Sequence, residues 1–192
     1  ILMNLSGIVD PLHKDREVVD LLYFPTGGGK TEAYLGLMAF VIANRRLRAS
    51  NTSEYNSDGG VTAILRYTLR LLTTQQRDRI TKMVLAAELI RQKTYPKYGT
   101  EPISIGFWVG GGVTPNKFEE LVEKADKPGE AKRKRNLLYK QLLTCPFCGK
   151  PLTEEEFYID PEQKSVAIYC ADNTCLFYKY SDKICQCLLF RR

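Results

Sequence analysis

The stretch Phe24-Pro25-Thr26-Gly27-Gly28-Gly29-Lys30-Thr31-Glu32 decides the fold expected for this 192-residue chain. It lies between an apolar segment and a pattern typical of a helix. Glycines let the backbone fold tightly, so that successive N–H groups point at phosphate oxygens. The following helix adds its positive N-terminal end. The sequence therefore predicts a phosphate-binding loop (P-loop) between a strand and a helix.

The predicted loop assigns roles to single residues. We expect Lys30 to reach the β- and γ-phosphates of ATP and the Thr31 hydroxyl to bind Mg²⁺, which makes these two the catalytic candidates. Phe24 stands where the strict Walker A pattern has glycine, and this departure leaves an ordinary Gly-rich turn as the alternative. Glu32 carries less information, because an acid in a first helical turn also favours the helix dipole. The predicted nucleotide-binding residues are Thr26, Gly27, Gly28, Gly29, Lys30, Thr31 and Glu32.

Three apolar segments rich in β-branched and aromatic residues predict buried strands, at 18–24, 61–67 and 103–109. Each precedes a helical pattern, and the predicted helices cover 31–48, 74–91 and 114–124. For the third helix, Thr114 is a suitable N-cap and Pro115 suits the first helical position. Alternating strands and helices predict an α/β fold with a parallel sheet covered by helices on both faces.

The character of the chain changes after residue 130. Residues 131–143 predict a basic helix, and residues 144–180 a small β module with strands at 157–159 and 166–169. The spacing Cys145-Pro146-Phe147-Cys148-Gly149 is a zinc-knuckle pattern, since two intervening residues let both sulfurs face one metal. With the second pair it predicts a zinc ribbon whose ligands are Cys145, Cys148, Cys170 and Cys175. Four protein thiolates leave no coordination position for water, so we expect the Zn²⁺ to be structural.

Two features of this second part stay open. Cys185 and Cys187 form a surplus pair, and one of them could replace Cys175 as a ligand. Residues 132–135 are four bases in a row, which a helix spreads around its cylinder, so not all four can face one partner. They form either a solvated face or a stripe that follows phosphates. The predicted domains are therefore a partial P-loop lobe at 1–130 and a basic helix with a zinc-ribbon insertion at 131–192.

Composition excludes several classes of protein. Hydrophobic residues make up 44% and charged residues 26%, which excludes wholesale disorder. The most apolar run, at 33–43, is too short to span a bilayer, and the N-terminus lacks the features of a signal peptide. We therefore expect a cytoplasmic protein, in which six cysteines indicate metal binding before disulfides. The net charge of +6 permits an anionic partner without naming one. Because the first residue is not Met, we also expect a fragment of a longer protein.

At this point the motifs carry a resemblance. Residues 25–32 resemble motif I of superfamily 2 helicases, and residues 66–76 (RYTLRLLTTQQ) resemble motif Ia of the same superfamily. That resemblance implies that Thr68 and Arg70 hold the sugar–phosphate backbone of a nucleic acid, a contact that positions a strand without reading its sequence. It also implies a backbone contact at the glycine turn that follows the third strand, formed by Gly110, Gly111 and Thr114. For Arg70 and Thr68, the alternative is a solvated arginine and a capping threonine.

Taken together, residues 24–37, 66–76 and 105–110 resemble the helicase subunit of the DISARM anti-phage defence system, over about residues 20–180. The resemblance implies the N-terminal RecA-like lobe of an ATP-dependent DNA helicase or translocase with an inserted cysteine module. It implies ATP, Mg²⁺ and Zn²⁺ as cofactors and DNA, as a single strand or duplex end, as a partner. The remaining helicase lobe and other defence-system subunits are further expected partners, and no membrane is involved.

Two parts of a working motor are missing from the sequence. No Asp-Glu pair follows an apolar strand downstream of Gly112, and no second lobe supplies an arginine finger. We therefore expect the isolated chain to hydrolyse little or no ATP. The alternative function is a non-catalytic zinc-ribbon module with a vestigial P-loop, which binds nucleic acid or docks to a protein.

Overall fold

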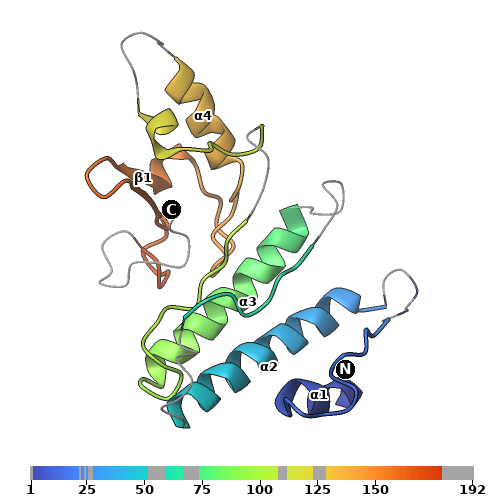
Figure 1. The fold of residues 1–192 in the computed structure, drawn as a ribbon. Coiled ribbons are helices and arrows are strands. Elements are labelled where there is room, and N and C mark those ends of the chain that lie inside the picture. Colours follow the sequence, from blue (N-terminus) through green and yellow to red (C-terminus); the bar gives the residue numbers. More distant parts are fainter. Residues whose placement is uncertain are drawn as a thin grey trace. The chain divides into compact units, whose positions relative to one another are not determined.

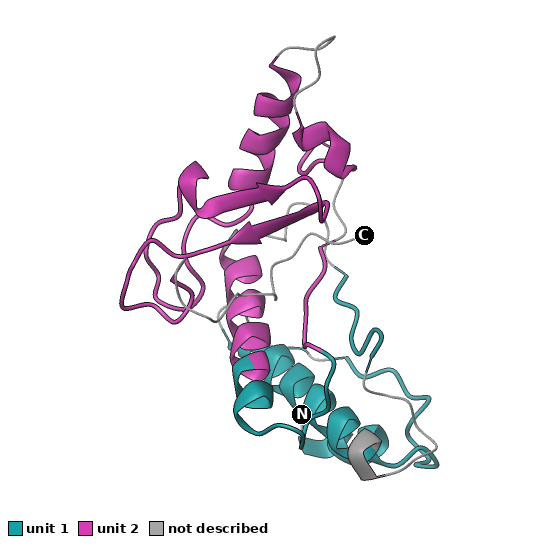
Figure 2. Cartoon of the chain, turned by 90° about the vertical axis from the view of Figure 1, so that its left-hand side faces the viewer, with its two compact units in different colours: residues 1–72, 89–101 teal, residues 73–88, 102–192 magenta. Residues whose placement is uncertain are grey.

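The computed structural model of the chain describes residues 2–21, 23, 25, 28–51, 59–66, 74–107, 112–122 and 129–178. These residues divide into two units (Figure 2). Unit 1 comprises residues 1–72 and 89–101, and unit 2 comprises residues 73–88 and 102–192. None of the described helices is long and apolar enough to cross a membrane.

Two long helices, α2 (Lys30–Asn51) and α3 (Thr74–Lys93), confirm the first two predicted helices (Figure 1). The start of α2 follows from its sequence, because the glycines that precede Lys30 favour a turn and Glu32 complements the N-terminal end of the helix dipole. Unit 1 also contains a short 3₁₀ helix, η1 (Leu2–Asn4), and one turn of helix, α1 (Leu5–Val9).

The part of α3 in unit 2 is anchored by an apolar stripe and a buried acid. Ile80, Val84 and Leu85 are buried at helical spacing. Glu88 is 2% exposed, and its Oε2 accepts a hydrogen bond from the Ile103 backbone N–H at 2.7 Å. A buried carboxylate is costly unless its oxygens are paired, so this bond fixes the segment that begins at Pro102 beside α3.

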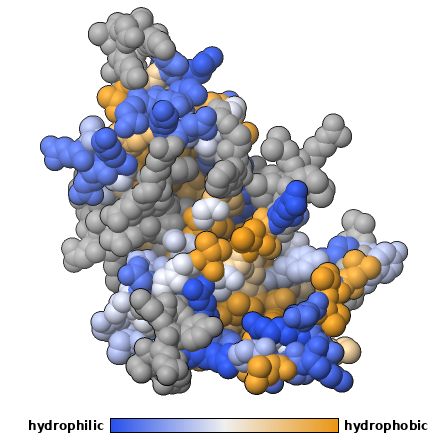
Figure 3. Space-filling model, in the orientation of Figure 1, coloured by the Kyte–Doolittle hydropathy of each residue, from blue (hydrophilic) through white to orange (hydrophobic). Residues whose placement is uncertain are grey.

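The predicted parallel sheet is not found among the described residues. Residues 18–21, 61–66 and 103–107, which belong to the three predicted strands, have no strand pairing in this structure, and positions 22, 24, 67, 108 and 109 lie outside the described residues. Strands of a parallel sheet need hydrogen-bonding neighbours and helices on both faces. The side chains of Val19, Leu21 and Ile64 are instead 93%, 90% and 85% exposed, and apolar (orange) surface is visible in Figure 3. Without cover, the first two segments gain nothing from strand burial, whereas Ile103 of the third is buried without a strand partner.

The prediction of a helix that begins at Thr114 is also wrong. Residues 112–117 form turns, and a four-residue 3₁₀ helix, η2 (Phe118–Leu121), follows extended Lys117. Thr114 is therefore no N-cap. The extent of η2 is set by a neighbouring helix, against which Leu121 is buried.

That neighbour is α4 (Glu130–Tyr139), which confirms the predicted basic helix but ends earlier than expected. Lys134 Nζ lies 2.7 Å from Glu120 Oε2, and Arg135 Nε donates to the Leu121 carbonyl at 2.7 Å. Leu138 is 1% exposed, and the Tyr139 ring lies 5.0 Å from the ring of Phe157. Two of the four consecutive bases thus face inward and hold η2.

The β module contains one antiparallel pair, β1 (Phe157–Asp160) and β2 (Ser165–Ile168), in the register Phe157↔Ile168 and Asp160↔Ser165. Both predicted strands are confirmed to within one residue. Before β1, the short 3₁₀ helix η3 (Glu154–Glu156) is closed by a capping box between Thr153 and Glu156. One face of the pair supplies the core of the module, including Val166 at 0% exposure.

The ion pair between η2 and α4 gives a pH-dependent prediction. The hydrogen bond from Lys134 lowers the pKa of Glu120 below its ordinary value. A lowered folded-state pKa contributes stability above the unfolded pKa, and this contribution is lost as the pH falls through the folded pKa. We expect Glu120→Gln to lower the free energy of unfolding by about 0.5–1 kcal/mol at about pH 7. At about pH 2 the difference should be smaller, because the wild-type carboxyl becomes protonated as the pH falls through its lowered folded-state pKa.

Urea denaturation followed by circular dichroism at both pH values measures this difference. Glu119→Gln is the matched control, because Glu119 is exposed and its contact to Lys164 is longer, at 3.4 Å. Equal effects of the two variants at neutral pH would contradict the assigned role of Glu120.

Candidate metal centre and phosphate loop

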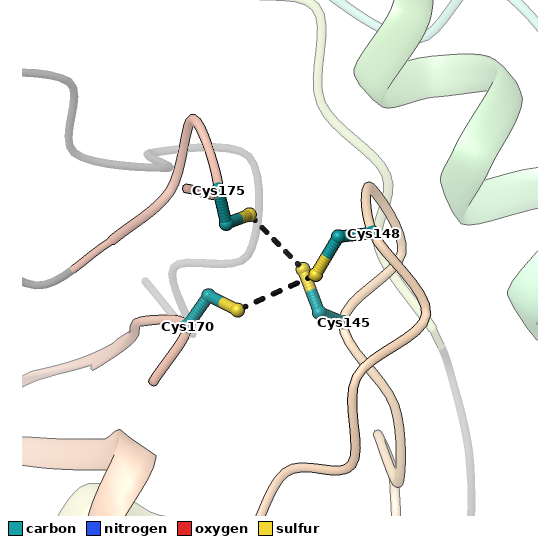
Figure 4. A group of neighbouring side chains, drawn as sticks. All are labelled: Cys145, Cys148, Cys170 and Cys175. Carbon is teal, nitrogen blue, oxygen red and sulfur yellow. Dashed lines mark hydrogen bonds between the residues drawn. The ribbon is translucent and has the colours of Figure 1, made fainter. Parts of the chain in front are cut away.

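Four cysteine side chains converge in unit 2 (Figure 4). The sulfurs of Cys145, Cys148, Cys170 and Cys175 all lie within 4.8 Å of one another. The Cys145–Cys175 distance is 3.8 Å and the Cys148–Cys170 distance is 3.5 Å, and all four thiols are free. A tetrahedron of sulfurs at about 2.3 Å from a zinc ion has edges of about 3.8 Å. The four cysteines are therefore placed so that they could hold a metal such as zinc.

Two tight turns place these sulfurs. In the first, the Gly149 N–H donates to the Cys145 carbonyl at 2.8 Å, and Gly149 takes a φ of 79°, which a side chain would disfavour. In the second, the Cys175 N–H donates to the Asp172 carbonyl at 2.9 Å, and the Asp172 N–H points at the Cys170 sulfur at 3.4 Å. Backbone N–H groups directed at sulfur favour the thiolate form.

The four thiols differ in burial and in acidity. Burial raises the pKa of Cys170 to about 11, and burial likewise raises the pKa of Cys175 above its ordinary value. Cys148 is exposed, and although desolvation acts against it, hydrogen bonds from the Lys150 backbone and the other thiols lower its pKa. A bound divalent cation offsets the cost of burying thiolates, and its binding releases their protons. The surroundings of Cys170 and Cys175 thus oppose their deprotonation unless a cation is bound.

The surroundings of the cluster are apolar. Leu142, Leu152 and Ile168 line a small cavity beside it, and the rings of Phe147 and Phe177 meet edge to face at 5.6 Å. A catalytic zinc site keeps an open position with polar groups around it. This cluster combines four sulfurs with an apolar lining, and the arrangement suits a structural metal.

The described part of the predicted P-loop leads directly into α2. The Gly28 N–H donates to the Pro25 carbonyl at 3.1 Å, and Gly29 has a φ of 77°, in the region that favours glycine. Lys30 begins the helix, and its Nζ lies 3.4 Å from the Pro25 carbonyl. Thr31 and Glu32 occupy the first turn, so their side chains lie at the helix N-terminus. Thr26 and Gly27 lie outside the described residues, and the nucleotide-binding roles of all seven residues stay predictions.

Most predicted nucleic-acid contacts cannot be placed. Thr68, Arg70, Gly110 and Gly111 lie outside the described residues, as do Cys185 and Cys187. Thr114 is half-buried in the turns before η2. The structure therefore brings the four metal candidates together and leaves the assignment of the nucleic-acid residues as predicted.

One residue that sequence reasoning missed joins three segments of unit 2. Gln141 Nε2 donates to the carbonyls of Val113, at 2.7 Å, and Leu137, at 2.8 Å. The guanidinium of Arg77 donates to Gln141 Oε1. Gln141 thus ties the first turns of α3 and the segment after Gly112 to the end of α4. No sequence signal marks it, because a glutamine at the end of a basic helix is ordinary.

Comparison with known proteins gives one informative match. No protein-family model and no solved structure matches the chain. The chain is 49% identical, over 185 residues, to the DISARM protein DrmA of Bacillus paralicheniformis. This chain is similar to a DISARM protein. The match covers 93% of the chain but 16% of DrmA, so the chain spans about a sixth of the length of that relative. The similarity to DrmA supports the resemblance to the DISARM system found in the motifs.

The cysteine geometry predicts one zinc ion per chain in a reduced preparation, measured by inductively coupled plasma mass spectrometry. Cys145→Ser removes a buried ligand and should abolish stoichiometric zinc. The control is Cys185→Ser combined with Cys187→Ser, which should keep the metal. A reduced wild-type chain without bound metal, or metal loss in the control, would contradict the four-cysteine site.

The Gln141 network predicts a separate effect on stability. Gln141→Ala removes the acceptor of one Arg77 hydrogen bond and the donor to the Val113 carbonyl, and should lower the free energy of unfolding by about 1–2 kcal/mol. Gln163→Ala, in the exposed turn between β1 and β2, should change it by less than about 0.5 kcal/mol. Thermal denaturation of the two variants makes the comparison, and equal stabilities would show that the network contributes nothing.

Proposed function

We propose that this chain is the nucleotide- and nucleic-acid-binding part of a DISARM defence protein, carried on a partial RecA-like lobe with a zinc-ribbon insertion. The 49% identity to DrmA supports the defence-system role. The observation that carries the nucleotide-binding role is the glycine turn at Gly28 and Gly29 that opens directly onto the N-terminus of α2. This is the local geometry that a phosphate-binding loop requires.

In this proposal the loop binds the phosphates of ATP. Backbone N–H groups of the loop surround the phosphate oxygens. The Gly28 N–H and Lys30 Nζ give up their contacts to the Pro25 carbonyl for phosphate oxygens, and Lys30 reaches the β- and γ-phosphates. Thr31 supplies a hydroxyl ligand to Mg²⁺ at the start of α2. Mg²⁺ neutralises charge on the phosphates when it is bound.

The nucleic-acid backbone is the second proposed ligand. Thr68 and Arg70 hold it ahead of α3, and Gly110, Gly111 and Thr114 hold it ahead of η2. Within unit 2, support for the second region comes from the Gln141 network, which ties Val113, the neighbour of Thr114, to Arg77 of α3. We propose DNA as the nucleic acid, as the resemblance to the DISARM helicase subunit implies.

The sheet of the lobe is proposed to form in a longer protein. The segments at 18–24, 61–67 and 103–109 would be its parallel strands. Exposed apolar side chains such as Val19, Leu21 and Ile64 support this, because surfaces of this kind usually mark a contact. The other helicase lobe and other DISARM subunits are the proposed partners, in the cytoplasm.

A second candidate function is a zinc-ribbon module that binds nucleic acid or docks to a protein while the P-loop is vestigial. The observation that favours it is the converged cysteine cluster, which needs no nucleotide to form. The two functions differ in whether the loop has a ligand.

Nucleotide binding separates them. We expect the chain to bind a fluorescent ATP analogue in the presence of Mg²⁺, and Lys30→Ala to weaken binding about 10–100-fold, since it removes a charged hydrogen-bond donor to phosphate. Lys14→Ala, at an exposed position of unit 1, is the matched control and should bind as the wild type does. Unchanged affinity in Lys30→Ala would favour the vestigial loop.

Turnover tests the remaining part of the proposal. We expect the isolated 192-residue chain to show little or no multiple-turnover ATP hydrolysis in a phosphate-release assay. Sustained hydrolysis that Lys30→Ala abolishes would contradict the expectation that catalytic groups lie elsewhere.

A further inference from the structure

The fold splits the four consecutive bases of α4 into two pairs with different surroundings. Lys134 and Arg135 are used inside unit 2, where they pair with Glu120 and the Leu121 carbonyl. Lys132 and Arg133 are exposed to solvent. Lys134 and Arg135 therefore stabilise the packing of α4 on η2. Lys132 and Arg133 take no part in that packing.

The outward pair belongs to a longer basic face. At about 100° of rotation per residue, Lys132, Arg133, Asn136 and Lys140 fall within an arc of about 100°. All four are exposed, and Lys140, the C-cap residue, keeps helical backbone angles. The buried residues Ala131 and Leu138 lie on the opposite side of α4. We call these four residues the outer basic face of α4; it contains no acidic residue.

The stability of the helix accounts for Lys140 at its C-terminal end, but not for Lys132 and Arg133. Lys132 and Arg133 lie in the first turn of α4, where the helix dipole favours acids over bases. Surfaces without a binding role usually intersperse charges of both signs. Lys132 and Arg133 thus oppose the dipole, although Glu130 of the same turn complements it, and a face with three bases and no acid suits an anionic ligand.

We propose that the outer basic face of α4 binds the phosphate backbone of a nucleic-acid strand. This inference rests on the proposed function and adds a second backbone contact to it. From Lys132 to Lys140 the face extends about 12 Å along the helix axis. This length exceeds the separation of neighbouring phosphates in a strand, so the face can contact more than one of them. Such contacts position a strand and carry no sequence information.

The inner side of α4 is held by packing contacts that do not involve the outer basic face. The Tyr139 ring packs against Phe157 of β1, and Lys134 and Arg135 fix η2 on the inner side. The bases of the outer face make none of these contacts. Substitutions on the outer face should therefore leave the metal site and the packing of α4 intact.

The test is a salt series with the complete chain. We compare wild type with Lys132→Ala/Arg133→Ala/Lys140→Ala, using fluorescence anisotropy of a labelled single-stranded DNA of mixed sequence and of a second, unrelated sequence. Each phosphate contact contributes about −0.7 to the slope of log K against log salt concentration for a single strand. The triple variant should reduce the magnitude of that slope by about 2 and weaken binding at least about 10-fold at low salt, equally for both sequences.

A matched triple variant controls for net charge. Lys14→Ala/Lys82→Ala/Lys97→Ala removes the same charge from exposed positions outside α4 and should leave the slope close to that of wild type. Zinc content and the circular dichroism spectrum of both variants should equal those of wild type, which shows that the chain is folded.

The outcomes separate this inference from the proposed function. If wild type binds DNA and the α4 variant keeps its affinity and slope, the inference fails and the proposed function stands. If the control loses as much affinity as the α4 variant, binding follows net charge and the inference also fails. If wild type binds no DNA, both fail. Tighter binding of polyglutamate than of DNA, lost in the α4 variant, would assign the face to an acidic protein and overturn the inference.

Discussion

The convergence of four thiols within 4.8 Å is the constraint on which unit 2 depends. A two-stranded antiparallel pair such as β1–β2 is marginally stable alone, and buried thiolates are costly without a cation. A metal bound here would offset both costs, because it would join the two cysteine turns that flank the strands. The consequences extend outward: Phe157 of β1 packs against Tyr139 of α4, and α4 holds η2 through Lys134 and Arg135.

In unit 1 the main local determinant is a turn at two glycines that precedes the long helix α2. Gly28 and Gly29 end an irregular segment, and a 22-residue helix, α2, begins at Lys30. The elements of this unit are local, and its apolar segments at 18–21 and 61–66 remain mostly exposed. One unit is thus suited to metal-dependent folding, and the other presents a loop, a helix N-terminus and uncovered apolar side chains.

Local chemistry could be predicted from the sequence, whereas long-range contacts could not. The bounds of α2 and α3 and the positions of β1 and β2 follow from periodicity, glycine placement and the cysteine spacing, which all act over a few residues. The predicted helix at 114–124 failed because Thr114 and Pro115 are good helix-start residues only in isolation, and contacts with α4 decide the extent of η2. The division of residues 132–135 into inward and outward bases depends on Glu120 and Leu121, and Gln141 owes its role to Arg77 and Val113. Pairing of the predicted parallel strands is likewise non-local, and their apolar character alone did not establish it.

The central claim is that four cysteine sulfurs hold one structural metal ion and that unit 2 is built around it. The most direct measurement is zinc K-edge X-ray absorption of the reduced chain. The account predicts a first shell of four sulfurs at about 2.3 Å and no oxygen or nitrogen ligand. A shell with fewer sulfurs, or one completed by nitrogen or oxygen, would contradict it.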